Sequence, residues 1–160
     1  MDVNHIGITV GDLDAAVRLY TSVFNLEVLV PAQTASMKTP FGDRRRDVFG
    51  PQWGEMRIAH LATPTGVGIE LFEFVEPATV KPEGEFEYWR VGISHLCLTV
   101  DDLDEAIAKL VSFGGRQRSE IHTVWPGTRI CYCQDPWGVV IELSSGTYHN
   151  ITGLRPAVGA

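Results

Sequence analysis

Two side-chain types that bind divalent metal ions occur in this sequence as a repeated pair. A histidine near the start of each half is followed, later in the same half, by a glutamate: His5 with Glu70, and His95 with Glu142. Imidazole nitrogens and carboxylate oxygens together suit divalent transition metals. If the two pairs meet, their side chains would hold one metal ion and leave positions open for water or substrate.

The sequence around these pairs repeats as well, so the chain contains a duplicated unit. The segment HIGITVGDLDAAV at 5–17 aligns with HLCLTVDDLDEAI at 95–107, and HLATPTGVGIEL at 60–71 aligns with YCQDPWGVVIEL at 132–143. Each copy has the pattern of a strand, a helix and three further strands. We therefore expect an α+β chain of two tandem βαβββ modules: module 1 (3–75), a linker (76–91), module 2 (92–145) and a C-terminal tail (146–160).

The alternation of side chains along the predicted strands places both pairs on comparable faces. In the first strand of each module, every second residue is apolar, and the histidine falls in the other set. In the last strand, Glu70 and Glu142 likewise alternate with apolar neighbours. Each module thus offers one imidazole and one carboxylate from the face away from its helix. An ionised carboxylate on an enclosed face is costly without a cation, which favours a metal site.

An insertion at 32–54 distinguishes module 1 from module 2. Because the segment is long, polar and contains glycine and proline, it predicts a functional loop such as a lid. The run Arg44, Arg45 and Arg46, together with Trp53, could hold a substrate carboxylate or phosphate. The simpler interpretation is that three consecutive arginines point mostly to solvent.

Composition limits the partners and the location of the chain. A net charge of −7 argues against nucleic acid and against anionic membranes. No apolar run approaches the roughly 20 residues that span a bilayer, and the first residues lack a signal-peptide pattern, so we expect a cytoplasmic protein. Cys97, Cys131 and Cys133 predict free thiols, and the last two are expected to be buried rather than to bind zinc.

These motifs resemble the vicinal oxygen chelate superfamily, which includes glyoxalase I, methylmalonyl-CoA epimerase, extradiol dioxygenases and the fosfomycin and bleomycin resistance proteins. The likeness covers about residues 3–145 and is carried by HIGITVGDL, GIEL, HLCLTVDDL and DPWGVVIE. It implies that the modules pair into an eight-stranded open cup, that ligands lie on the first and last strands, and that the chain forms a homodimer. All four ligand positions of the glyoxalase I pattern are filled: His5, Glu70, His95 and Glu142.

The ligand set favours a metal-dependent lyase or isomerase. One divalent ion (Zn, Ni, Co, Mn or Fe(II)) would bind adjacent oxygens of a small-molecule substrate and stabilise the enediolate left by proton removal. Glu70 or Glu142 could act as the base, and His60 is a second candidate, although a strand histidine more often has a structural role. Glutathione is not expected as the co-substrate, because Thr9 and Phe74 replace the arginine and asparagine that glutathione-using relatives carry.

Two other functions remain open. An extradiol-type dioxygenase would use His5, His95 and Glu142 to hold Fe(II), and Tyr132 stands where similar extradiol enzymes carry an active-site tyrosine. Glu70 argues against that function, because a fourth protein ligand would occupy a position that O₂ chemistry needs. The third hypothesis is a non-catalytic small-molecule binding or resistance protein, but such relatives generally lack the ligands that are intact here.

Overall fold

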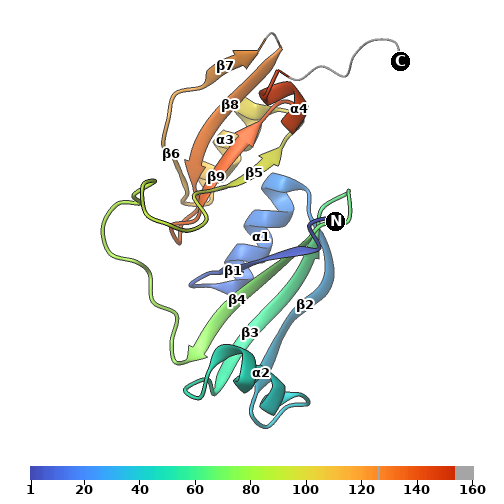
Figure 1. Cartoon of the computed structure of the whole chain (residues 1–160), viewed down its shortest axis with the longest axis vertical. Coiled ribbons are helices and arrows are strands. Elements are labelled where there is room, and N and C mark those ends of the chain that lie inside the picture. Colours follow the sequence, from blue (N-terminus) through green and yellow to red (C-terminus); the bar gives the residue numbers. More distant parts are fainter. Residues whose placement is uncertain (126, 154–160) are drawn as a thin grey trace. The chain divides into compact units, whose positions relative to one another are not determined.

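The computed structural model describes residues 1–125 and 127–153, which fall into two compact units that divide after Pro82 (Figure 1). The first unit contains β1 (His5–Thr9), α1 (Leu13–Phe24), β2 (Glu27–Ser36), α2 (Gly42–Phe49), β3 (Glu55–Ala62) and β4 (Gly68–Glu76). The second contains β5 (Leu96–Thr99), α3 (Leu103–Ser112), β6 (Arg116–Gln117), β7 (His122–Trp125), β8 (Thr128–Gln134), β9 (Val140–Ser144) and α4 (Tyr148–Ile151). The predicted α+β class and the two βαβββ modules are confirmed.

The sheet of the first unit has the order β1-β4-β3-β2, with β1 parallel to β4 and the other neighbours antiparallel. Helix α1 contacts β2, β3 and β4, so it covers one face of this sheet. The register sets Gly7 and His60 on either side of Glu70. Because side chains alternate along a strand, Glu70 points to the face opposite α1.

The sheet of the second unit repeats this order as β5-β9-β8-β6, and β7 also pairs with β8. The second sheet therefore has five strands instead of the four expected, because the counterpart of β2 is divided into β6 and β7. At the break, the backbone N–H groups of Arg118 and Ser119 both donate to the carbonyl oxygen of Tyr132, at 2.7 and 3.2 Å. Cys97 and Tyr132 flank Glu142 in this sheet, as Gly7 and His60 flank Glu70.

Local sequence explains where the two long helices begin. The carboxylates of Asp12 and Asp102 each accept a hydrogen bond from a free N–H group of the first turn, at 2.9 Å. Asp12 and Asp102 stand at equivalent places in the repeat, so the duplication preserves the cap. One face of each helix is buried: Leu13, Ala16, Leu19, Tyr20, Val23 and Phe24 in α1, and Leu103, Ala106, Ile107 and Leu110 in α3.

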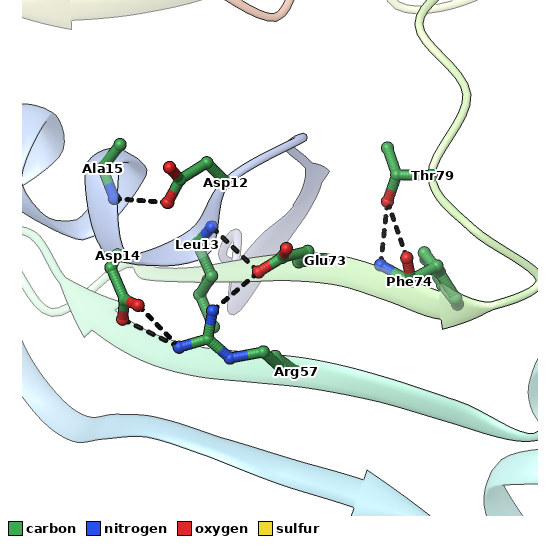
Figure 2. Close-up of polar contacts among 8 residues, drawn as sticks. All are labelled: Asp12, Leu13, Asp14, Ala15, Arg57, Glu73, Phe74 and Thr79. Atoms are coloured by element: carbon green, nitrogen blue, oxygen red, sulfur yellow. Dashed lines mark hydrogen bonds and ion pairs between the residues drawn. The ribbon is translucent and has the colours of Figure 1, made fainter.

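A polar network fastens α1 to its sheet (Figure 2). The Glu73 carboxylate on β4 accepts from the backbone N–H of Leu13 at 3.1 Å and from Arg57 of β3 at 2.9 Å. Arg57 also donates to both carboxylate oxygens of Asp14, at 2.9 and 2.8 Å. Module 2 keeps the equivalent arginine–aspartate pair, Arg129 with Asp104. The network fixes the start of the helix over the two central strands.

The insertion 32–54 is not the open loop that its composition predicts. Strand β2 continues to Ser36, and 42–49 form α2. Trp53 is 2% exposed and packs in a core cluster with Ala35, Met56 and Ile58. The physical reason is tertiary: Phe49 of α2 lies 5.8 Å from the ring of Phe72 and 5.5 Å from that of Phe74. Trp53 therefore belongs to the core, and the prediction that it contacts a ligand is wrong.

The arginines of α2 interact with their own segment. The Arg44 guanidinium lies 4.6 Å from the centre of the Phe41 ring. Arg45 and Arg46 donate to the backbone carbonyls of Pro40 and Pro51. These contacts tie the three side chains to the two ends of α2.

The remaining local predictions concern cysteines, membrane spans and the tail. All three cysteines are free, and Cys131 and Cys133 are buried with their sulfurs 3.9 Å apart. Within the part of the chain that the structure describes, no helix combines the length and the apolar character that a membrane crossing needs. The tail contains α4, which begins with a capping box between Thr147 and Asn150. Residues 154–160 of the predicted tail lie outside the described residues.

Candidate functional site

The first unit brings His5, His60 and Glu70 together on the face opposite α1. The Glu70 carboxylate lies between the two imidazoles, with Oε2 3.5 Å from His5 Nε2 and Oε1 3.2 Å from His60 Nδ1. The side chains remain partly exposed, at 51% for His5, 31% for His60 and 27% for Glu70. The parallel β1–β4 pairing and the antiparallel β3–β4 pairing account for this convergence.

Aromatic side chains border this half-site. Phe72 and Phe74 follow Glu70 at every second position of β4, so they share its face. Their rings stack 6.2 Å apart, and Phe49 of α2 packs against both. A Cβ added at Gly7 would lie 3.1 Å from the Phe72 ring, so a glycine at this position leaves room for the aromatic wall. One end of the half-site is therefore apolar.

The second unit builds its half-site around a more deeply buried carboxylate. His95 Nε2 lies 2.9 Å from Glu142 Oε2, and the Glu142 side chain is 8% exposed. The Tyr132 ring packs edge-on against His95 with 5.2 Å between ring centres. Tyr132 and Cys97 occupy the register positions on either side of Glu142. This carboxylate thus has an imidazole, a phenol and a thiol around it.

The surroundings of Glu142 raise the pKa values of two neighbouring side chains, Tyr132 and Cys97. Burial, followed by the negative charge of Glu142, raises the pKa of the Tyr132 phenol to about 12. The same two causes raise the pKa of the Cys97 thiol to about 12, although Cys97 as a whole residue is exposed. Both groups are therefore protonated at neutral pH and can act as hydrogen-bond donors toward Glu142.

Each first-strand histidine is oriented by the residue before it. His5 Nδ1 lies 2.7 Å from the Asn4 side-chain oxygen, and His95 Nδ1 lies 2.9 Å from the Ser94 hydroxyl. In both half-sites, Nε2 is the ring nitrogen that faces the carboxylate. A hydrogen bond at one ring nitrogen that fixes the other toward a cation is the usual arrangement of a metal-binding histidine.

The structure therefore pairs the predicted ligands within each module. Sequence reasoning missed Asn4, Ser94 and Cys97, although Cys97 shares its strand parity with His95 and could have been found in that way. Among residues 1–125 and 127–153, no three His, Cys, Asp or Glu side chains of one cluster are placed to hold a metal ion by themselves. His122 lies on β7 opposite Ile130 and is exposed.

Two βαβββ modules that carry an imidazole–carboxylate pair on matching strands define a protein of the glyoxalase-like fold. The family comparison agrees: residues 2–143 match the model of the Glyoxalase/Bleomycin resistance protein/Dioxygenase superfamily. The chain belongs to this superfamily, as its motifs predict.

Three similar proteins illustrate the range of this superfamily. A protein from an Actinomyces species named 2-epi-5-epi-valiolone epimerase is 32% identical over 149 residues, which cover 88% of this chain and 77% of the relative. A glyoxalase family protein from Bacillus cereus has a TM-score of 0.73 and 25% identity, covering 88% of this chain and 91% of its own. A fosfomycin resistance protein from Listeria monocytogenes, solved with Mn(II) and a sulfate ion, has a TM-score of 0.59 and 16% identity, with 93% and 95% covered. The last likeness shows the fold alone.

Proposed function

We propose that this protein is a metal-dependent isomerase or lyase that removes a proton from a carbon next to a chelated carbonyl, and that its preferred reaction is an epimerisation. The observation that carries the proposal is the repeated pairing of an oriented histidine with a carboxylate, His5 with Glu70 and His95 with Glu142. The similarity to an epimerase at 32% identity favours epimerisation over the other reactions of the superfamily.

The donor atoms fit a divalent metal ion. In both pairs, Nδ1 is engaged by the preceding side chain, so a neutral imidazole that donates through Nδ1 presents the lone pair of Nε2 to the carboxylate. Two electron-rich groups facing each other are stabilised by a cation between them. We propose that His5, Glu70, His95 and Glu142 hold one such ion. When bound, the ion would act as a Lewis acid for the substrate carbonyl.

Proton transfer is assigned to the side chains that differ between the modules. His60 and Tyr132 occupy equivalent positions of β3 and β8, each beside the glutamate of its module. Glu70, with His60 3.2 Å away, would accept the proton from the substrate carbon and share it with the imidazole. Tyr132, which is protonated at neutral pH, would donate a proton or a hydrogen bond beside Glu142. An epimerisation removes a proton from a carbon and returns one to it, so one proton acceptor and one proton donor of different chemistry suit this reaction.

The substrate is proposed to be a small molecule with adjacent oxygen atoms, such as a hydroxylated ketone. Phe74 belongs to the aromatic wall beside Glu70, and an apolar side chain at this position offers no partner for a glutathione carboxylate. The compound in the name of the Actinomyces relative, 2-epi-5-epi-valiolone, is the first candidate to test. We also propose that the chain works as a homodimer, which sedimentation equilibrium would measure.

An experiment on metal content and proton exchange tests this function. The chelator-stripped protein is loaded in turn with Zn, Ni, Co, Mn or Fe(II), and loss of the substrate C–H signal in D₂O is followed by NMR. We expect His95→Ala, Glu142→Gln and Glu70→Gln to lower both bound metal and exchange. The matched control is Glu105→Gln, which removes a carboxylate from an exposed pair with Lys109. Metal-independent exchange, or full metal binding by all three site variants, contradicts the proposal.

A dioxygenase is the second candidate, favoured by the contact between Tyr132 and His95. It would show O₂ consumption and ring cleavage of a catechol by the Fe(II)-loaded protein, with activity retained in Glu70→Gln. The proposed isomerase requires Glu70, so this single variant separates the two functions.

A further inference from the structure

A cavity next to the second half-site is lined by Tyr132 and by three residues that the proposed proton chemistry does not use. It has a volume of about 320 Å³ and is lined by Tyr88, Arg118, Ser119 and Tyr132, all in the second unit. The volume is at the lower end of the range of small-molecule sites. The Tyr88 and Tyr132 rings meet edge to face with 6.0 Å between their centres. Since Tyr132 also contacts His95, the Tyr132 ring links the cavity to the imidazole of this half-site.

The polar wall of the cavity is held in place by backbone bonds. Arg118 and Ser119 follow β6 at the break of the edge strand, and their N–H groups donate to the Tyr132 carbonyl. In return, the Tyr132 N–H donates to the Ser119 hydroxyl at 3.0 Å. The Arg118 guanidinium lies 5.6 Å from the centre of the Tyr88 ring and its side chain is only 14% exposed. The cation is therefore oriented before any ligand arrives.

The Glu85 carboxylate already pairs with the guanidinium groups of Arg116 and Arg118. Glu85 Oε2 lies 2.5 Å from Arg116 Nη2 and 3.4 Å from Arg118 Nη1. The Gln134 side-chain oxygen accepts from both arginines, at 2.8 and 2.9 Å, but it is neutral. Arg116, and after it Arg118, hold the pKa of Glu85 below its usual value, so this group is an anion at neutral pH.

Glu85 is weakly attached. Its side chain is 69% exposed, and it lies on a segment without helix or strand. An exposed ion pair contributes little free energy, because water and salt screen its charges. A ligand anion that also buries carbon atoms against the tyrosines could therefore replace it.

We propose that this cavity binds an anionic small molecule whose carboxylate or phosphate displaces Glu85 from Arg118 and Arg116, while its carbon frame packs against Tyr88 and Tyr132. As an anion site, the proposal stands on the cavity alone. As part of the enzyme's substrate site it rests on the proposed function, and it then favours hydroxylated carbonyl compounds with an acidic group over the neutral 2-epi-5-epi-valiolone. Arg118 is the residue that selects for charge, and Glu85 competes with the ligand.

Binding of matched probes tests the site without catalysis. Mandelate and phenyl phosphate carry an aromatic ring with a carboxylate or a phosphate, and mandelamide is a neutral analogue. Isothermal titration of the full chain, with and without added metal, gives the three dissociation constants. We expect at least one anion to bind about tenfold or more tightly than mandelamide, and the tighter of the two identifies the acidic group.

Three variants assign the binding to the named residues. Arg118→Gln is expected to weaken the anion about tenfold or more, because it removes the charged donor. Glu85→Gln is expected to strengthen it about two- to fivefold, because it removes a competitor. Arg90→Gln is the control, since it removes an equal charge from an exposed pair with Glu87.

The outcomes separate the two proposals. Anion binding to the chelator-stripped protein supports the cavity site even if metal binding fails. Equal affinity for mandelate, phenyl phosphate and mandelamide, or absence of binding by all three, overturns it even if the metal-dependent reaction is found. If Arg118→Gln does not fold by circular dichroism, the wild-type selectivity and the gain in Glu85→Gln still decide the question.

Discussion

Replacement of Glu73 tests how the first module positions its site. Glu73 accepts from Leu13 and Arg57, so the change to alanine leaves the first N–H of α1 without its acceptor (Figure 2). Leu13 is fully buried as a residue, and water reaches it poorly. Arg57 keeps Asp14, which is the first cause of its raised pKa, so the arginine itself is not left unpaired. The expected loss therefore comes mainly from the helix start.

The magnitude follows from these contacts. A hydrogen bond to a charged group contributes about 1.5–3 kcal/mol, and the partly exposed Arg57 contact adds little after solvent screening. Glu73→Ala should thus lower the free energy of unfolding by about 2–3 kcal/mol. Glu73→Gln keeps an acceptor at the same place and should lose about half of that. The control Glu105→Ala, in an exposed helix pair, should change it by less than about 0.5 kcal/mol.

Urea unfolding followed by circular dichroism measures these free energies, and amide hydrogen exchange locates the change. We expect faster exchange at Leu13 in both Glu73 variants and normal exchange in α3. A loss below about 0.5 kcal/mol for Glu73→Ala, with Leu13 still protected, would falsify the view that this carboxylate holds α1.

Three further predictions concern the second module. Asp135→Ala should lower the free energy of unfolding, measured in urea, by about 2–4 kcal/mol, because this buried carboxylate accepts hydrogen bonds from the N–H groups of Trp137, Gly138 and Val139. Asp135→Asn should lose less, and equal losses in the two variants would refute the role of the charge. Gly115→Ala should lower the free energy of unfolding by about 1–3 kcal/mol in the same assay, because the added Cβ would lie 2.8 Å from the Gln134 carbonyl oxygen and 2.3 Å from the Leu110 side chain. A variant as stable as the wild type would show that the turn can move aside. In the chelator-stripped protein, Cys97 should react slowly with iodoacetamide below about pH 10, because its thiol pKa is about 12. Glu142→Gln should speed the reaction at fixed pH, because it removes the carboxylate whose charge opposes thiolate formation. An unchanged pH profile in Glu142→Gln would mean that burial alone sets this pKa.

Short-range patterns were sufficient to predict much of the fold. The alternation around His5 and Glu70 gave the strand faces correctly, because side-chain direction in a strand depends on the backbone alone. The caps at Asp12 and Asp102 are local in the same way, since each uses only the first turn of its own helix. The repeat then transferred each inference from one module to the other.

The features that sequence reasoning missed depend on distant contacts. Helix α2 is held by Phe49 against Phe72 and Phe74, and an eight-residue polar segment shows no sign of that packing on its own. Tyr88 belongs to the predicted linker, yet its ring contacts Tyr132, more than forty positions away in the chain. Arg118 lies where bonds to the Tyr132 carbonyl divide the edge strand into β6 and β7, a break that the predicted pattern of three further strands does not contain.

The divided edge strand has a consequence for how this protein can change. In the first module, the edge strand β2 is one continuous ten-residue strand that pairs with β3 from Glu27 to Ser36, so a substitution there disturbs this ladder. In the second module, the stretch between β6 and β7 carries few ladder bonds and projects its side chains around a cavity. Random libraries restricted to 116–121 are therefore a small and well-placed starting point for directing this protein to new ligands.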